Sequence, residues 1–343
     1  MNDDFNLLEE MIHSCGVSGY NEESYSIFLR EASKLGLTCA PDILGSASAF
    51  IAPPNIYQRY RPKNIMVCSH HDTHGHIVSK LNKDKTIDLK TVAEECCENE
   101  EGIVRTKSGI VPIIFFDVDE ENLTAKARLQ DNTDYTKISI GDIASLKPWV
   151  EEKIKGKLSG TFLDNKIGCL ITVLVMRNLV KSISTDINSN IYIVHTSFEE
   201  TSISWGAKAA VEKIKPSLVI NVDMGPVDKK SQLGKGPLIY TGPRFNRKLN
   251  NLAINICEEL KIPYEIEICS DEASSDVDVI PPLNGGTAVC EIAYPGMNFH
   301  EFEEHVSKRD IYRTSKLVTE MCLRAQYVDS LLPGGLNELS RMQ

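Results

Sequence analysis

The sequence predicts an α/β fold of three layers, with a mostly parallel central sheet that is interrupted by a small β-domain. Short continuous runs of apolar residues are typical of strands buried on both faces of a parallel sheet. Amphipathic helical stretches separate these runs along the chain, which is the pattern of an α/β domain. Residues 79–157 lack this alternation and instead hold short segments rich in β-forming residues.

The helices and buried strands follow from the spacing of apolar residues. In residues 5–34 apolar side chains recur at helical spacing, and Gly16-Val17-Ser18-Gly19 divides the stretch into two helices. The same spacing predicts four further helices, over residues 164–181, 205–214, 246–260 and 309–328. The apolar runs between them predict buried strands at residues 65–68, 190–194, 218–222 and 287–292.

The interrupting region predicts a separate β-domain. Its β-like segments are divided by turn or charged residues and cover residues 85–89, 102–105, 111–116, 123–129 and 137–143. We therefore expect three parts: an α/β domain of residues 1–78 plus 158–330, an inserted β-domain of residues 79–157, and a loose C-terminal tail of residues 331–343.

Length and composition agree with a globular protein of this kind. At about 150 residues per domain, 343 residues predict two domains or one domain with an insertion. Hydrophobic residues make up 42% and charged residues 25% of the chain, which allows a sizeable core. The formal net charge of −11 argues against nucleic acids and anionic membranes as main partners, because both need a cationic protein face.

The cysteines and the N-terminus predict a cytoplasmic protein. The ten cysteines are irregularly spaced and form no C-x-x-C pair, which excludes a cysteine zinc knuckle and a thioredoxin-like motif. The acidic start of the chain does not resemble a secretory signal. No stretch approaches the roughly 20 apolar residues that span a bilayer. We expect reduced thiols in the cytoplasm.

Acidic residues and histidines follow three of the predicted buried strands. Because ligand sites in open α/β sheets form at the carboxyl ends of strands, we expect these side chains to meet at one edge. One residue at the start of a helix and one beyond the last strand are expected to join them. The candidates are His70, Asp72, Asp164, Glu199, Glu200, Asp223 and His300.

This donor set favours a divalent transition metal. Imidazoles combined with carboxylates suit zinc, cobalt, nickel or iron, whereas a pure carboxylate cage would suit magnesium or calcium. Asp72 can accept the second N–H of the His70 ring and fix its tautomer. In the pair Glu199-Glu200, one carboxylate can bind metal while the other deprotonates a bound water. Taken singly, Asp164 could be an ordinary helix cap, and Asp223 could cap a turn.

The residues also occur in a longer order of motifs: Gly16-Val17-Ser18-Gly19-Tyr20, Ser69-His70-His71-Asp72, Phe162-Leu163-Asp164-Asn165-Lys166-Ile167-Gly168-Cys169, Glu199-Glu200, Asn221-Val222-Asp223 and His300. This order resembles the dinuclear-zinc tetrahedral aminopeptidases, metallopeptidase family forty-two, over about residues 7–325. The family includes glutamyl aminopeptidases and enzymes labelled glucanases. Related dizinc peptidases and deacylases place their bridging Asp closer to His-x-Asp, so the long interval before Asp164 matches the family's inserted β-barrel-like domain.

The resemblance implies two divalent metal ions per subunit, zinc or else cobalt. His70 and Asp223 would bind one ion, Glu200 and His300 the other, and Asp164 would bridge both. Glu199 would be the general base that deprotonates a water shared by the ions and later passes the proton to the leaving amine. Asp72 would orient His70. The family also implies a homo-oligomer, up to a dodecamer.

Departures from the family pattern supply candidates for the substrate pocket. The residues after His-x-Asp are here Thr73-His74-Gly75-His76, so His74 and His76 either shape the pocket, add metal affinity, or face solvent in a turn. The family's Gly-Gly-Thr-Asp turn is here Ser274-Ser275-Asp276, which adds Ser275 and Asp276. Glu304 matches a family carboxylate and is a further candidate. The turn after Glu199-Glu200 is also longer.

We expect an aminopeptidase that trims short peptides. Two alternatives use the same residues: a dizinc amidohydrolase or deacylase for a small N-acylated metabolite, and a non-catalytic paralogue that binds peptides without turnover. Other classes lack their motifs. Gly234-Lys235-Gly236 has neither the spacing nor the hydroxyl residue of a phosphate-binding loop, and the sequence contains no Gly-x-Ser-x-Gly and no His-Glu-x-x-His.

Overall fold

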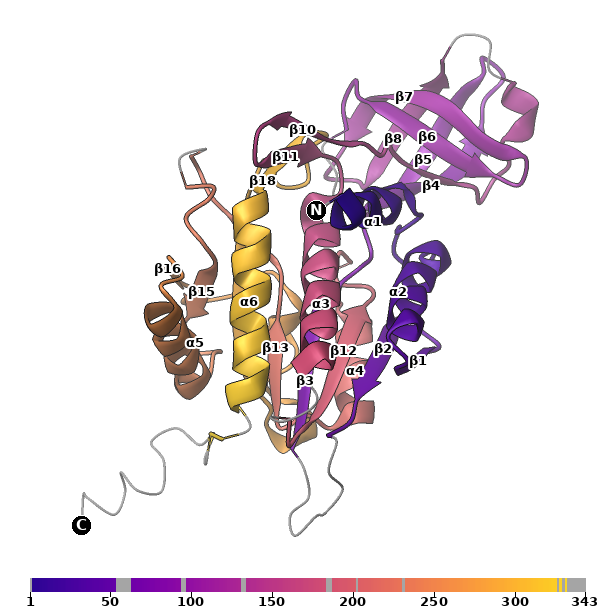
Figure 1. The fold of residues 1–343 in the computed structure, drawn as a ribbon. Coiled ribbons are helices and arrows are strands. Elements are labelled where there is room, and N and C mark those ends of the chain that lie inside the picture. Colours follow the sequence, from indigo (N-terminus) through magenta and orange to yellow (C-terminus); the bar gives the residue numbers. More distant parts are fainter. Residues whose placement is uncertain are drawn as a thin grey trace.

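The structure, a computed structural model, describes residues 2–53, 63–93, 97–130, 134–182, 187–201, 203–229, 232–325, 327–328 and 331. It has a layered α/β body with a separate group of strands at one end (Figure 1). Of the predicted C-terminal tail, residues 332–343 lie outside the described residues. Leu331 accepts a hydrogen bond at its carbonyl oxygen from Asn246 Nδ2 at 2.7 Å.

The body is built on one large sheet. Its strands in the described chain are β1 (Thr38–Pro41), β2 (Ala47–Ile51), β3 (Asn64–His70), β10 (Val150–Ile154), β11 (Lys157–Gly160), β12 (Asn190–Thr196), β13 (Leu218–Asn221), β14 (Met224–Pro226), β15 (Leu238–Thr241), β16 (Glu265–Ile268), β17 (Ala288–Met297) and β18 (Glu304–Ser307). They are ordered β1-β2-β12-β3-β13-β17-β18-β11-β10, with β14 and β15 paired to β17, and β16 to β15. The middle strands β12, β3, β13 and β17 are parallel, which confirms the predicted sheet.

Helices cover both faces of this sheet. They are α1 (Asn2–His13), α2 (Glu22–Lys34), α3 (Leu163–Ser182), α4 (Trp205–Ile214), α5 (Arg247–Leu260) and α6 (Lys308–Ala325), close to the predicted bounds. On β3, Ile65 and Val67 join a core with α1, α2, α3, α5 and α6, whereas Met66 and Cys68 join a second core with α4. Successive strand residues point to opposite faces, so a continuous apolar run fills both cores. In the described residues no helix combines the length and apolarity needed to cross a bilayer.

The inserted region forms a closed antiparallel barrel with its own apolar core. Its strands, in the spatial order β4-β5-β8-β7-β6-β9, are β4 (Gly75–Leu81), β5 (Thr86–Ala93), β6 (Glu101–Thr106), β7 (Gly109–Asp119), β8 (Thr124–Leu129) and β9 (Ile143–Leu146). Val78, Leu89 and Phe115 are fully or almost fully buried inside it. The barrel strands appear at one end of the α/β body in Figure 1.

Two details differ from the segments predicted for this region. The strand expected at residues 137–143 is wrong, because a short 3-10 helix, η1 (Tyr135–Lys137), ends at its first residue and a turn and irregular backbone follow until β9 begins at Ile143. The Asp134 side chain accepts from the Thr136 backbone N–H at 3.0 Å and starts this helix. Strands β10 and β11 pair with the large sheet rather than the barrel. We therefore propose that the inserted domain is bounded by the barrel strands, residues 75–146, instead of 79–157.

Candidate metal centre

Three neighbouring strands deliver the predicted residues to one edge of the sheet. Strand β3 ends at His70, which is buried, and it lies between its parallel neighbours β12 and β13. Glu199 and Glu200 follow the end of β12, and Asp223 follows the end of β13. Because the strands are parallel, their carboxyl ends meet, as the sequence pattern predicts.

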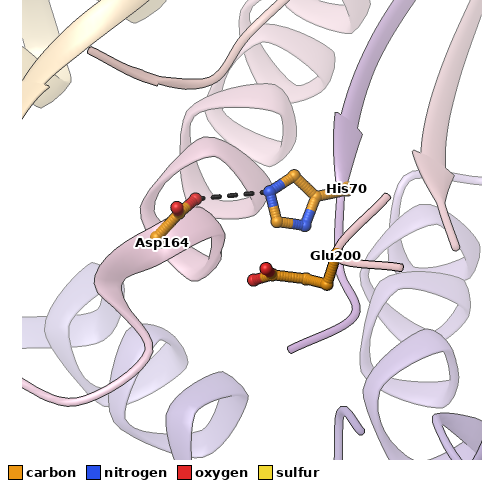
Figure 2. A group of neighbouring side chains, drawn as sticks. All are labelled: His70, Asp164 and Glu200. Atoms are coloured by element: carbon orange, nitrogen blue, oxygen red, sulfur yellow. Dashed lines mark hydrogen bonds and ion pairs between the residues drawn. The ribbon is translucent and has the colours of Figure 1, made fainter. Parts of the chain in front are cut away.

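Asp164, in the first turn of α3, lies between two histidines. Its Oδ1 is 3.2 Å from His70 Nε2, and its Oδ2 is 3.5 Å from His300 Nε2. His300 comes from the loop between β17 and β18, and its Nε2 is also 3.3 Å from Glu200 Oε2. In Figure 2 the carboxylates of Asp164 and Glu200 and the His70 ring point into one shared space. Each oxygen of Asp164 therefore faces a different imidazole.

The His70 ring is held by contacts on both of its nitrogens. Its Nε2 lies 3.5 Å from Asp223 Oδ1 and 3.8 Å from Glu199 Oε2. Its Nδ1 is 3.2 Å from the backbone oxygen of Asp72 and 3.7 Å from the Asp72 carboxylate. That carboxylate accepts from Ser18 Oγ at 2.6 Å and from the Glu199 backbone N–H at 3.3 Å. Asp72 thus ties the His70 segment to the Glu199 segment.

The carboxylates of the centre are poorly compensated by protein charges. Burial raises the pKa of Glu199 well above its usual range, and it also raises the pKa of Glu200 and of Asp223. The negative charges of neighbouring carboxylates act in the same direction. A buried carboxylate that resists ionisation in the protein alone is stabilised by a cation from outside.

The pKa values of Asp164 and His300 shift in the directions that favour their charged forms. Burial alone would raise the pKa of Asp164, but hydrogen bonds from His300 and His70 outweigh it and hold the pKa well below its usual range. Burial would lower the pKa of His300, yet the charges of Glu200 and Asp164 raise it to about 10. Asp164 is therefore an anion wherever the two histidines, or cations in their place, are present.

The donor set fits a divalent transition metal. One ligand atom each from His70, Asp164 and Glu200 lie within 4.8 Å of one another. Glu200 Oε1 is buried and has no hydrogen-bond partner among the described residues, so one oxygen of this carboxylate remains available to a metal. Mixed imidazole and carboxylate donors are those that zinc and cobalt accept.

The centre opens into a cavity of about 370 Å³. Its inner wall is formed by the predicted residues His70, Asp164, Glu199, Glu200, Asp223 and His300. Its outer wall is formed by Ser204, Arg244, Glu272, Ser274, Ser275, Asp278, Val279 and Phe299. Sequence reasoning missed Arg244, Glu272 and Phe299, which belong to no motif. Arg244 Nε donates to the Asp271 backbone oxygen at 2.8 Å, so the outer wall depends on the loop that follows β16.

The substrate-pocket candidates are distributed differently from the prediction. Ser275 lines the cavity, but the cavity lining includes neither Asp276 nor Glu304. Asp276 is buried behind the wall, where it accepts a hydrogen bond from Thr196 Oγ1. Burial raises the pKa of Asp276 to about 6. Glu304 is also fully buried.

The two additional histidines are buried, so a solvent-facing turn is wrong for both. His74 is buried behind the cavity. The centroid of its ring lies 5.1 Å from that of the His300 ring and 5.3 Å from that of the Phe162 ring. His76 points into the barrel, where its Nδ1 is 3.1 Å from Thr91 Oγ1 and its ring packs on Phe115. Neither lines the cavity, because the chain turns from β3 into the barrel at this point.

Comparison with known proteins agrees with this fold and site. Residues 55–317 match the family model described as M42 glutamyl aminopeptidase. A curated relative, the lysyl aminopeptidase of Pyrococcus furiosus, is 25% identical over 342 residues, covering 92% of this chain and 95% of the relative. The chain is thus a peptide hydrolase of the metal-dependent aminopeptidase class. It belongs to the M42 glutamyl aminopeptidase family, which confirms the resemblance found in the motif order.

Solved structures share the architecture at low identity. The TET aminopeptidase of the archaeon Thaumarchaeota SCGC AB-539-E09 has a TM-score of 0.84 at 19% identity, covering 100% of this chain and 99% of that one. The aminopeptidase APDkam598 of Desulfurococcus kamchatkensis has a TM-score of 0.85 at 18% identity, covering 98% and 99%. These similarities confirm the fold, with its sheet and inserted barrel.

Proposed function

We propose that this chain removes N-terminal residues from short peptides with the help of two divalent metal ions, zinc or else cobalt. One observation carries the proposal: the two oxygens of Asp164 face His70 on one side and His300 on the other, at 3.2 and 3.5 Å. A carboxylate with an imidazole at each oxygen is suited to bridge two ions. Family membership supports the metal-dependent chemistry.

Five residues would hold the ions. His70 and Asp223 would bind the first ion, Glu200 and His300 the second, and Asp164 would be shared. When bound, the ions would supply Lewis acidity, which polarises the scissile carbonyl and lowers the pKa of water. The substrate's free α-amine would be recognised at the Glu200 and His300 side of the centre.

Glu199 would carry the proton in this reaction. It lines the cavity without being assigned to a metal, and its Oε2 is 3.8 Å from His70 Nε2, at the edge of the donor set. Glu199 takes the proton of the attacking water and returns it to the leaving amine. Burial raises its pKa, which favours a group that must hold a proton between the two transfers.

Asp72 and Ser18 would position these groups. The Asp72 carboxylate accepts from Ser18 and from the Glu199 backbone N–H, and its backbone oxygen lies next to His70 Nδ1. A single residue thereby orients both His70 and the base. Outer partners of this kind change metal affinity or activity by about 10–100-fold when removed.

We also propose that the chain forms a homo-oligomer, up to a dodecamer, with peptides and not nucleic acids as partners. One structural neighbour is described as a dodecamer, and the TET1 peptidase of Pyrococcus horikoshii as assembling into a tetrahedron or an octahedral shell. The net charge of −11 supports the exclusion of nucleic acids. Size-exclusion chromatography with light scattering tests the assembly, and a monomeric mass would contradict it.

The direct test of the mechanism is Glu199→Gln, measured by hydrolysis of aminoacyl anilides. Removal of the base is expected to lower kcat by about 10²–10⁴-fold. Glu212→Gln, which changes an exposed carboxylate on α4, is the matched control and is expected to keep full activity. Wild-type kcat in the Glu199→Gln variant would overturn the assignment of the base.

A further inference from the structure

Glu304 connects two segments of the metal centre through their backbones. Its Oε2 accepts a hydrogen bond from the Asp164 backbone N–H at 3.1 Å, and its Oε1 accepts one from the His300 backbone N–H at 3.1 Å. The side chain is fully buried. Both oxygens of one carboxylate are therefore used, each by a residue whose own side chain points into the centre.

The position of Glu304 is fixed by the sheet. It is the first residue of β18, where its backbone is paired with Gly160 of β11. Strand β11 leads directly into α3 and Asp164, and the loop from β17 to β18 carries His300. From this pair of strands, the Glu304 side chain therefore reaches two segments: the one that follows β11 and holds Asp164, and the one that precedes β18 and holds His300.

The two bonded residues lie in irregular backbone that needs external support. His300 has φ of 59°, in the left-handed region that side chains rarely adopt. Asp164 has φ of −81° and ψ of 116°, which are not helical values although it lies within α3. Conformations of this kind persist where the surrounding structure over-determines them. The two acceptor oxygens of Glu304 are such a support, because a backbone N–H that is shielded from water needs an acceptor within the protein.

We propose that Glu304 is a positioning residue for the metal centre, setting the separation of Asp164 and His300 by holding both of their backbone amides. This inference rests on the proposed function, since it assumes that these two side chains bind metal. Asp164 would serve both ions and His300 one of them, so a shift of either backbone changes the site. The geometry of such donors must be held within about 0.5 Å to be productive.

The test compares Glu304→Gln with Glu303→Gln. Gln at position 304 keeps one acceptor oxygen but presents an NH₂ group to the second amide, so one of the two bonds is lost. Glu303 is the neighbouring carboxylate; its side chain is half-exposed and pairs with Lys153 Nζ at 2.8 Å, whereas the backbone amides of Asp164 and His300 are held by Glu304. It controls for removal of a charge from the same loop.

The first readout is the zinc affinity of the metal-stripped proteins, measured by calorimetric titration. Glu304→Gln is expected to bind zinc about 10–100-fold more weakly than the wild type, and Glu303→Gln to match the wild type. In anilide hydrolysis, kcat of Glu304→Gln should fall while KM stays within about 3-fold, and excess zinc should restore part of the activity. Because zinc bound to the folded state also stabilises it, the Tm of each metal-stripped variant is measured first, and the comparison of zinc affinities is made between variants that are folded without metal.

Two outcomes separate failure of this inference from failure of the proposed function. If the wild type binds zinc and Glu304→Gln binds it equally tightly with unchanged kcat, Glu304 is not a positioning residue and the proposed function stands. If the wild type itself binds no divalent metal, the proposed function fails first. Should Glu304→Gln prove unstable, Glu304→Asp, which keeps both acceptor oxygens but shortens the reach, must still weaken zinc binding, or the inference is overturned.

Discussion

Two groups of charged residues in this molecule, one largely at the surface and one buried, are built in opposite ways. The first, the N-terminal charge cluster, joins α1, α2 and α3 and consists of Asp4, Glu10, Arg30, Glu31, Lys34 and Arg177. The second, the metal-centre cluster, consists of His70, Asp164, Glu199, Glu200, Asp223 and His300. In the first, every carboxylate faces a guanidinium or an ammonium group. In the second, four carboxylates share only two imidazoles.

The pKa directions follow from this difference. Burial would raise the pKa of Glu31, but Lys34 Nζ at 2.6 Å and Arg177 Nη2 at 2.8 Å, together with Arg30, lower it below its usual range. The pKa of Glu200 is instead raised by burial, and its imidazole partner only partly offsets that effect. A cluster that neutralises itself supports the fold, whereas one with excess buried anion requires a cation from outside.

The largest effect expected from this comparison concerns the substrate's amine. If the metal-centre cluster recognises a free α-amine, N-acetylated aminoacyl anilides should be hydrolysed about 10⁴-fold more slowly than the free-amine compounds, because a buried polar site would be left unpaired. The two substrate series are compared by kcat/KM at one zinc concentration. A preference for the N-blocked series would favour a deacylase over an aminopeptidase.

A second test uses opposite effects on stability. Glu31→Gln should lower the free energy of unfolding by about 1–2 kcal/mol, because it weakens hydrogen bonds between charged groups. Glu200→Gln should raise the stability of the metal-free protein by about 1 kcal/mol, since residues kept for function at a site are often destabilising. Urea unfolding of both variants in the presence of a chelator measures the two values. Destabilisation by Glu200→Gln as large as that by Glu31→Gln would remove the distinction between the clusters.

The smallest effect is a pH dependence confined to the N-terminal charge cluster. Because the pKa of Glu31 is lower in the folded protein than its ordinary value of 4.5, its stabilisation is fully present above that value. It is lost as the pH falls through the folded pKa. The stability difference between the wild type and Glu31→Gln should therefore be constant near neutral pH and shrink by about pH 3. If the stability difference between the wild type and Glu31→Gln grew as the pH fell, the lowered pKa of Glu31 would be contradicted.

The sequence predicted those parts of the molecule that depend on local pattern. His70 and Asp223 follow buried apolar runs, and a strand that is buried on both faces determines where its carboxyl end lies. The barrel was predicted as an insertion because its segments lack helical periodicity. The prediction of a strand at residues 137–143 was wrong because Asp134 and Thr136 form a local turn, which competes with the pairing of strands.

The remaining features depend on contacts between distant segments. Arg244, between β15 and α5, and Glu272, in the loop after β16, line the same cavity, and no motif marks either segment. The hydrogen bonds of Glu304 require the pairing of β18 with β11, which short apolar patterns do not reveal. His76 of β4 packs against Phe115 of β7 because the barrel closes and brings these two strands to the same interior. Such long-range approaches are set by tertiary packing rather than by local spacing.

The central claim is that the metal-centre cluster is completed by divalent ions. Calorimetric titration of the metal-stripped wild-type protein with zinc tests it most directly, with thermal unfolding of the same samples as a check. We expect binding at two ions per subunit and a rise in Tm with zinc concentration, because a ligand bound only to the folded state stabilises it. No binding, with a Tm that does not respond to zinc or cobalt, would contradict the account.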